Sequence, residues 1–172
     1  MSFLGRLQRC SFLLVLSFVI ASCAAEVTQE EFTEPSDPVT YFSKDHAEMN
    51  AAISAARGTL ESFFAILQND RRIESPLLKV AVPNSEGGAE HIWMKPASLD
   101  DPDKFVAIVD NRPAKVPSLQ LGDFYEFSAD QISDWSYVKD GKLHGGYTIR
   151  VILGRMSKDE ADQFKIDFAP LP

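Results

Sequence analysis

The amino-acid sequence predicts an α+β fold, with a long N-terminal helix on a curved antiparallel sheet or a small open β-barrel of about five strands, and a short C-terminal helix. Two observations predict this fold. Residues 46–68 repeat apolar side chains at the spacing of one helix face, and the chain after Pro76 contains short β-like runs separated by turn residues. Connections this short favour antiparallel neighbours, and a helix with one apolar stripe needs one partner surface.

The first helix is the clearest element of the sequence. Its apolar residues fall on one face: Met49, Ile53, Ala56, Leu60, Phe63, Phe64 and Leu67. Asp45 can cap the first turn, and Glu48 stands three residues later, as in a capping box. One continuous helix from about His46 to Gln68 is therefore expected.

The predicted strands follow that helix. They cover residues 77–82, 90–95, 105–110, 124–127 and 146–153, which are short runs rich in β-forming residues. The pair Asp140-Gly141 predicts a tight turn that returns residues 137–139 toward residues 142–144. Ser157 with Glu160 offers a second capping box, which predicts the short C-terminal helix.

Residues 1–22 have the layout of a secretory leader. Arg6 and Arg9 precede an apolar run over residues 12–20, and the segment contains no acidic residue. A membrane-spanning helix needs about 20 apolar residues, and this run is roughly half that length. The run is therefore expected to be removed as a signal peptide and not to remain as an anchor.

The end of this leader, Ile-Ala-Ser-Cys at residues 20–23, resembles the bacterial lipobox. The resemblance implies cleavage before Cys23 and lipid attachment to that cysteine, so that the protein is held to a membrane of the cell envelope and faces the periplasm or the exterior. Ala24 follows where aspartate would retain an enterobacterial lipoprotein in the inner membrane, which favours the outer membrane. The alternative is an ordinary secretory signal that is cut near Ala25.

Residues 23–44 are predicted to form a flexible acidic tether, because they hold acids and prolines without a sustained apolar period. Residues 45–172 then form a single domain. The formal net charge of the chain is −8, which argues against a nucleic-acid partner and against attachment to anionic lipid heads by charge. The membrane is therefore expected to be reached through the lipid on Cys23.

Several short blocks of the predicted domain occur in the order of a known bacterial family. They are residues 88–94, 121–123, 132–135, 140–142 and 145–148, together with the helix opening at residues 48–53. The chain resembles the YegJ-like family of domains of unknown function in these blocks. The resemblance covers nearly the whole predicted domain, but it implies no established activity and supplies no catalytic residue.

His91 and Trp93 are the first candidate binding residues. They alternate with Ile92 and Met94 along a predicted strand, so the two pairs lie on opposite sheet faces. If Ile92 and Met94 face the core, His91 and Trp93 face outward and can form a recognition patch. The alternative is that the long helix or a loop covers Trp93.

Asp134, Trp135 and His144 are the remaining candidates. Asp134 can cap a turn that Trp135 anchors in the core, or it can pair with His91 or His144 as an acid and base. His144 is followed by two glycines, which predict either a bulge between strands or a close approach to a ligand.

The sequence contains no motif of a nucleophile elbow, a phosphate-binding loop or a dinucleotide-binding turn. Its histidines are far apart without ligand spacing, so no metal and no cofactor are expected. Cys10 lies in the leader and Cys23 is taken by lipid, which leaves no free thiol for catalysis.

These observations favour a non-catalytic binding or interaction module of the cell envelope, with an unknown envelope partner. The alternative is an envelope hydrolase, in which His91 or His144 is the base and Asp110 or Asp134 orients it. A structural accessory of the envelope is a third possibility.

Overall fold

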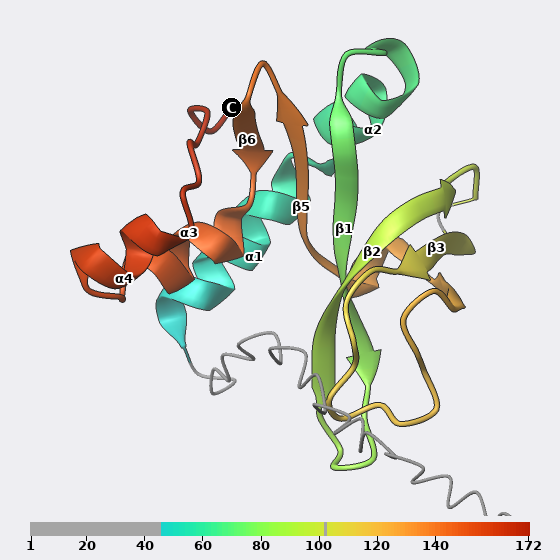
Figure 1. Ribbon diagram of the computed structural model, residues 1–172. Coiled ribbons are helices and arrows are strands. Elements are labelled where there is room, and N and C mark those ends of the chain that lie inside the picture. Colours follow the sequence, from blue (N-terminus) through green and yellow to red (C-terminus); the bar gives the residue numbers. More distant parts are fainter. Residues whose placement is uncertain (1–45, 102) are drawn as a thin grey trace, which may run out of the picture. The chain divides into compact units, whose positions relative to one another are not determined.

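Six antiparallel strands form one open sheet in the computed structural model of the protein, which describes residues 46–101 and 103–172 (Figure 1). The strands are β1 (Glu74–Pro83), β2 (Ala89–Ser98), β3 (Phe105–Val109), β4 (Phe124–Phe127), β5 (Ile132–Lys139) and β6 (Lys142–Gly145). Their order is β4-β3-β2-β1-β5-β6, so β4 and β6 are edges and the sheet does not close into a barrel. The predicted α+β class is confirmed.

The single helix predicted over residues 46–68 is instead two helices, α1 (Ala47–Gly58) and α2 (Leu60–Asn69). Gly58 is a poor helix former, and the Thr59 hydroxyl donates to the carbonyl oxygen of Ala56 at 3.1 Å. The Trp135 indole N–H donates in turn to Thr59 Oγ1 at 3.1 Å, which holds the break against the sheet. A continuous long helix is therefore not confirmed.

The start of α1 is capped by His46, whose Nδ1 accepts the backbone N–H of Met49 at 3.2 Å. The cap predicted at Asp45 lies outside the described residues, as do the predicted leader and tether. Glu48 pairs with Arg155 at 2.9 Å. In the described part of the chain, none of the helices is both long and apolar enough to cross a membrane.

The strand predicted over residues 146–153 is wrong, because residues Tyr147–Leu153 form the helix α3. Gly145 and Gly146 have φ of 71° and 62°, a left-handed conformation that ends β6 and starts the helix. A Cβ on Gly145 would stand 2.3 Å from the carbonyl oxygen of Trp135. The glycine pair is thus a junction between a strand and a helix and not a bulge between two strands, and Gly145 allows close contact with the protein's own backbone. The alternative of a close approach to a ligand stays a prediction.

The other predicted elements are confirmed. Four of the five predicted strands correspond to β1 to β4, and the turn at Asp140-Gly141 joins β5 to β6. The second capping box is formed by Ser157 and Glu160 at the start of the helix α4 (Lys158–Gln163). Beyond this helix the chain returns to β6, where Leu143 and Phe168 form a parallel bridge.

The hydrophobic core lies on one face of the sheet. Ala56 of α1 and Phe63 of α2 pack there against the strands, and the Phe63 ring stacks on Trp135 with 5.1 Å between ring centroids. Ile92 and Met94 of β2 are completely buried in this core. Because side chains alternate along a strand, His91 and Trp93 face the other side, as predicted.

Candidate functional site

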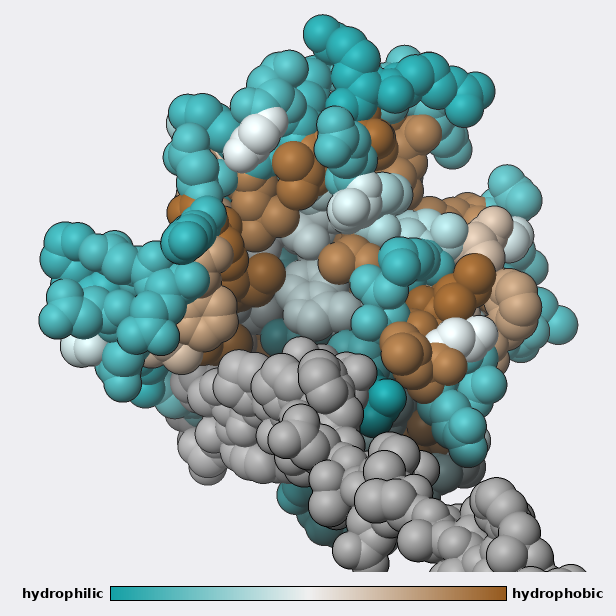
Figure 2. Space-filling model, in the orientation of Figure 1, coloured by the Kyte–Doolittle hydropathy of each residue, from teal (hydrophilic) through white to brown (hydrophobic). Residues whose placement is uncertain are grey.

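A cleft of about 1220 Å³ lies on the face of the sheet opposite the core. Its floor comes from the centre of β1 and β2, and its sides come from α1, α3, β5, β6 and the loops over residues 84–88 and 110–115. Figure 2 shows the hollow at the centre of the molecular face, with mostly hydrophobic residues along its left side and a mixture of hydrophilic and hydrophobic residues along its right side. A cavity of this size can hold a small molecule.

The two sides of the cleft differ in chemistry. The apolar wall, contributed by α1, α3, β1, β5 and β6, consists of Met49, Ile53, Leu77, Val138, Leu143, Ile149 and Ile152. The polar wall, contributed by β2 and the two loops, consists of Asn84, Glu86, Glu90, His91, Asn111 and Lys115. The elements of the apolar wall also place Asn50, Arg57, Ser136 and Thr148 on the cleft. A ligand that fills the cleft therefore meets mostly hydrocarbon on one side, with a few polar groups among it, and hydrogen-bonding groups on the other.

Lys79 stands on the floor where the two walls meet. Its Nζ donates to Thr148 Oγ1 of α3 at 3.2 Å and lies 5.4 Å from the centroid of the Trp93 ring. Lys79 pairs with Trp93 in the β1–β2 register, which places the two side chains next to each other. Burial lowers the pKa of the Lys79 ammonium, and the charge of Asp134 acts in the opposite direction.

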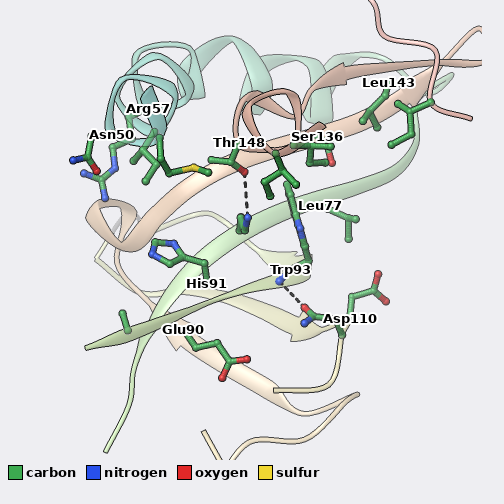
Figure 3. Close-up of a pocket in the computed structure, with 18 of the residues that line it drawn as sticks. Asn50, Arg57, Leu77, Glu90, His91, Trp93, Asp110, Ser136, Leu143 and Thr148 are labelled. Atoms are coloured by element: carbon green, nitrogen blue, oxygen red, sulfur yellow. Dashed lines mark hydrogen bonds between the residues drawn. The ribbon is translucent and has the colours of Figure 1, made fainter. Parts of the chain in front are cut away.

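His91 lies on the polar wall beside Trp93, and both face Arg57 of α1 and Thr148 of α3 in Figure 3. The hydroxyl of Ser133 donates to the carbonyl oxygen of Lys79 at 3.0 Å and is 2.8 Å from His91 Nδ1. Because the hydroxyl has a single proton, Nδ1 must be the donor in this contact. His91 Nε2 therefore presents a lone pair.

The imidazole of His91 is uncharged at neutral pH. It is open to the solvent of the cleft, but the surrounding walls remove much of its hydration, which lowers its pKa to about 4. The positive charges of Lys79 and Arg57 contribute to the same shift. Two cations thus lie close enough to act on His91, although the chain as a whole is acidic.

Asp134 is completely buried in β5 and holds the start of α3. Its carboxylate accepts the backbone N–H groups of Trp135, Tyr147 and Thr148 at 2.8, 3.1 and 2.7 Å, and the hydroxyl of Thr148 at 2.6 Å. Burial raises the pKa of Asp134, while the bonds from Thr148 and Trp135 and the charge of Lys79 act to lower it. Asp134 therefore holds the start of α3 from within a strand, whereas the simpler sequence interpretation expected it to cap a short turn of its own beside Trp135.

Trp135 and His144 also lie away from the cleft lining. Trp135 is 2% exposed in the core, where its indole N–H donates to the carbonyl oxygen of Ala56 at 3.0 Å. His144 of β6 stacks on Tyr137 with 4.7 Å between ring centroids. Of the five predicted binding residues, only His91 and Trp93 line the cleft, and whether they bind a ligand stays a prediction.

The histidine and aspartate pairs that a hydrolase would use are not formed. His91 bonds to Ser133, and Asp134 bonds to backbone N–H groups and to Thr148. Asp110 forms an ion pair with Lys95 of β2. Within residues 46–101 and 103–172, no group of three or more histidine, cysteine or acidic side chains is placed to hold a metal ion.

Sequence reasoning missed Lys79, Thr148 and the apolar wall. One signal for Lys79 was present, because a lysine in the middle of the apolar strand Leu77–Val82 must leave the core face. The apolar wall could not be recognised, since its members come from segments far apart in the sequence. Ile149 and Ile152 also fell in the segment predicted as a strand.

Comparisons with known proteins agree with the resemblance found in the sequence blocks. The family described as "Uncharacterized protein conserved in bacteria (DUF2314)" matches residues 46–169. The chain is 28% identical over 153 residues to the uncharacterized protein YegJ of Escherichia coli strain K12, a match that covers 89% of this chain and 94% of YegJ.

A second relative is a protein of Neisseria meningitidis serogroup B that is named as an ankyrin repeat protein. The chain is 30% identical to it over 133 residues, covering 72% of this chain and 52% of the relative, so it spans about half of that protein's length. No solved structure matches the chain. The match to the family model covers most of the chain, including every described helix and strand, and the chain therefore belongs to the DUF2314 family of proteins conserved in bacteria.

Proposed function

We propose that this domain is a non-catalytic binding module that holds a small amphipathic ligand in the cleft. The observation that supports this proposal is the division of one cleft into an apolar wall and a polar wall. A ligand with a hydrocarbon part would remove aliphatic surface from water on one side, at about 25 cal/mol per Å² of apolar area. Its polar part would keep hydrogen-bonding partners on the other side.

A binding role is favoured over hydrolysis because the polar groups are not arranged as an acid and base. A general base is oriented by a second group that accepts its other proton, and in this cleft that place is taken by the Ser133 hydroxyl, which also bonds to the backbone. A hydroxyl in this place fixes the tautomer of His91, but it does not stabilise an imidazolium as a carboxylate would.

We further propose that the domain is tethered to a membrane of the bacterial envelope through lipid on Cys23. What supports this is the leader-like composition of residues 1–22 and the lipobox-like residues that end at Cys23. The ligand or partner would then be one that reaches the same membrane face. Neither the leader nor the tether lies in the described part of the chain.

The binding proposal is tested with N-phenyl-1-naphthylamine, an uncharged apolar dye whose fluorescence rises in an apolar site. The chain has two tryptophans, of which Trp135 is buried in the core and Trp93 lines the cleft. We expect one dye molecule to bind per chain. Energy transfer from tryptophan to the bound dye should be weaker in the Trp93→Phe variant than in the wild type. We expect Ile152→Ser to weaken dye binding about tenfold, because it removes an aliphatic contact from the apolar wall.

Leu121→Ser is the matched control, since Leu121 is an apolar side chain that is 53% exposed and does not line the cleft. Thermal unfolding of each variant checks that the fold is kept. Equal dye affinity in the wild type, Ile152→Ser and Leu121→Ser would overturn the assignment of the cleft as the binding site.

A further inference from the structure

We infer that the polar end of the ligand is a carboxylate, and that Lys79 binds it where the apolar and polar walls meet. This inference rests on the proposed binding function and names the chemical class of the ligand: an amphipathic monoanion with an aliphatic body. The contacts of Lys79, the indole N–H of Trp93 and the state of the neighbouring acids carry it.

The Lys79 ammonium has donors to spare. An ammonium carries three N–H groups, and in the described part of the chain Lys79 Nζ makes one hydrogen bond, to Thr148 Oγ1 at 3.2 Å, and no ion pair. The Thr148 hydroxyl donates its own hydrogen bond to the Asp134 carboxylate, so it accepts from Lys79. Asp134 already accepts hydrogen bonds from Trp135, Tyr147 and Thr148 and is saturated. Two N–H groups of Lys79 are therefore left for a ligand.

A second donor lies next to Lys79. The backbone N–H of Trp93 is taken by Asn111 Oδ1 at 2.8 Å, whereas its indole N–H has no hydrogen-bond partner in the described residues. The Lys79 ammonium lies 5.4 Å from the centroid of this ring, so the two donors border one small region. An ammonium and an indole N–H together suit an anionic acceptor.

The acidic side chains around the cleft are already occupied. Glu90 accepts the backbone N–H groups of Ala114 and Lys115, both at 2.7 Å. Glu86 pairs with Lys115 at 2.8 Å, and Asp110 pairs with Lys95. These carboxylates are held by other partners, so the positive charge of Lys79 is not cancelled by a side chain within the cleft.

A single negative charge fits this site better than a double one. Phosphate is usually held by several cations or by arginine forks. The floor of the cleft offers one ammonium, and the Arg57 guanidinium of the cleft lining already donates to the carbonyl oxygens of Ile132 and Asp130, both at 2.7 Å. Glu86 on the polar wall would also repel a dianion. The apolar wall begins directly beside Lys79, with Leu77 two residues away on the same strand face. An aliphatic chain attached to the carboxylate can therefore run along this wall.

The test compares decanoate, decyl alcohol and decyl phosphate as competitors of N-phenyl-1-naphthylamine on the full chain. We expect decanoate to bind at least about tenfold more tightly than the alcohol, because the alcohol lacks the charge that Lys79 pairs with. Lys79→Met, which keeps the length of the side chain without its charge, should remove this preference. Lys79→Arg should keep it.

Lys104→Met is the matched control, because Lys104 is an exposed lysine that does not line the cleft, and it should keep the preference of the wild type. If no decyl compound displaces the dye, the proposed function itself fails. If decanoate and the alcohol compete equally in the wild type, the function stands and the carboxylate site is wrong. Tighter binding of decyl phosphate than of decanoate would also overturn the carboxylate assignment. The wild-type and Lys79→Arg comparisons decide the matter even if Lys79→Met does not fold.

Discussion

Replacing Asp134 with alanine is expected to lower the free energy of unfolding by about 3 to 5 kcal/mol, the cost of breaking a buried charged network. The substitution removes the acceptor of two backbone N–H groups at the start of α3 and of the Thr148 hydroxyl. It also removes the negative charge nearest to the buried Lys79. A domain of this size has a total stability of about 5 to 15 kcal/mol, so the variant should lose a large fraction of its stability.

The measurement is urea unfolding followed by far-ultraviolet circular dichroism. Asp103→Ala is the control, because Asp103 is exposed and a surface substitution of this kind changes stability by about 0.5 kcal/mol or less. Asp134→Asn should also be strongly destabilised, because an amide cannot accept all of these donors. A loss below about 1 kcal/mol in Asp134→Ala would show that α3 does not depend on this cap.

Replacing Cys23 with alanine is expected to move the protein entirely from the membrane fraction to the soluble fraction of cells. Lipid attachment requires the thiol of Cys23, and the acidic chain has no net positive charge that would hold it to anionic lipid heads. The measurement is the distribution of the chain between membrane and soluble fractions, together with the incorporation of labelled palmitate.

Cys10 provides the matched control, because the sequence has two cysteines and Cys10 lies within the predicted leader. Cys10→Ala should keep both the label and the membrane fraction. If the Cys23→Ala protein stayed in the membrane fraction, attachment through lipid on this cysteine would be wrong.

Local sequence patterns were sufficient to predict the fold class. The two wrong predictions, a strand over residues 146–153 and one continuous helix over residues 46–68, failed because of long-range contacts. Residues 147–153 are rich in β-branched side chains, which favour a strand. They form a helix instead, and its first turn is capped by Asp134, which lies in β5. The break between α1 and α2 depends on Thr59, whose hydroxyl is held by Trp135 and lies 2.9 Å from the Tyr147 hydroxyl. A sequence read locally contains none of these partners.

The candidate site was predictable only in part, for a similar reason. Strand alternation was sufficient to place His91 and Trp93 on the open face. The importance of Lys79 depends on its register opposite Trp93 and on its contact with Thr148, which is 69 residues away in sequence. The apolar wall likewise exists only once α1 and α3 lie beside the sheet.

The most direct test of the cleft as a ligand site is the nuclear Overhauser effect between bound decanoate and the methyl and aromatic side-chain protons of the full chain. We expect contacts from the decanoate methylenes to Ile149 and Ile152 of the apolar wall, and none to Ile66 of α2, which does not line the cleft. Contacts confined to other surfaces, such as exposed Leu121 and Phe124, with none to Ile149 or Ile152, would contradict the account.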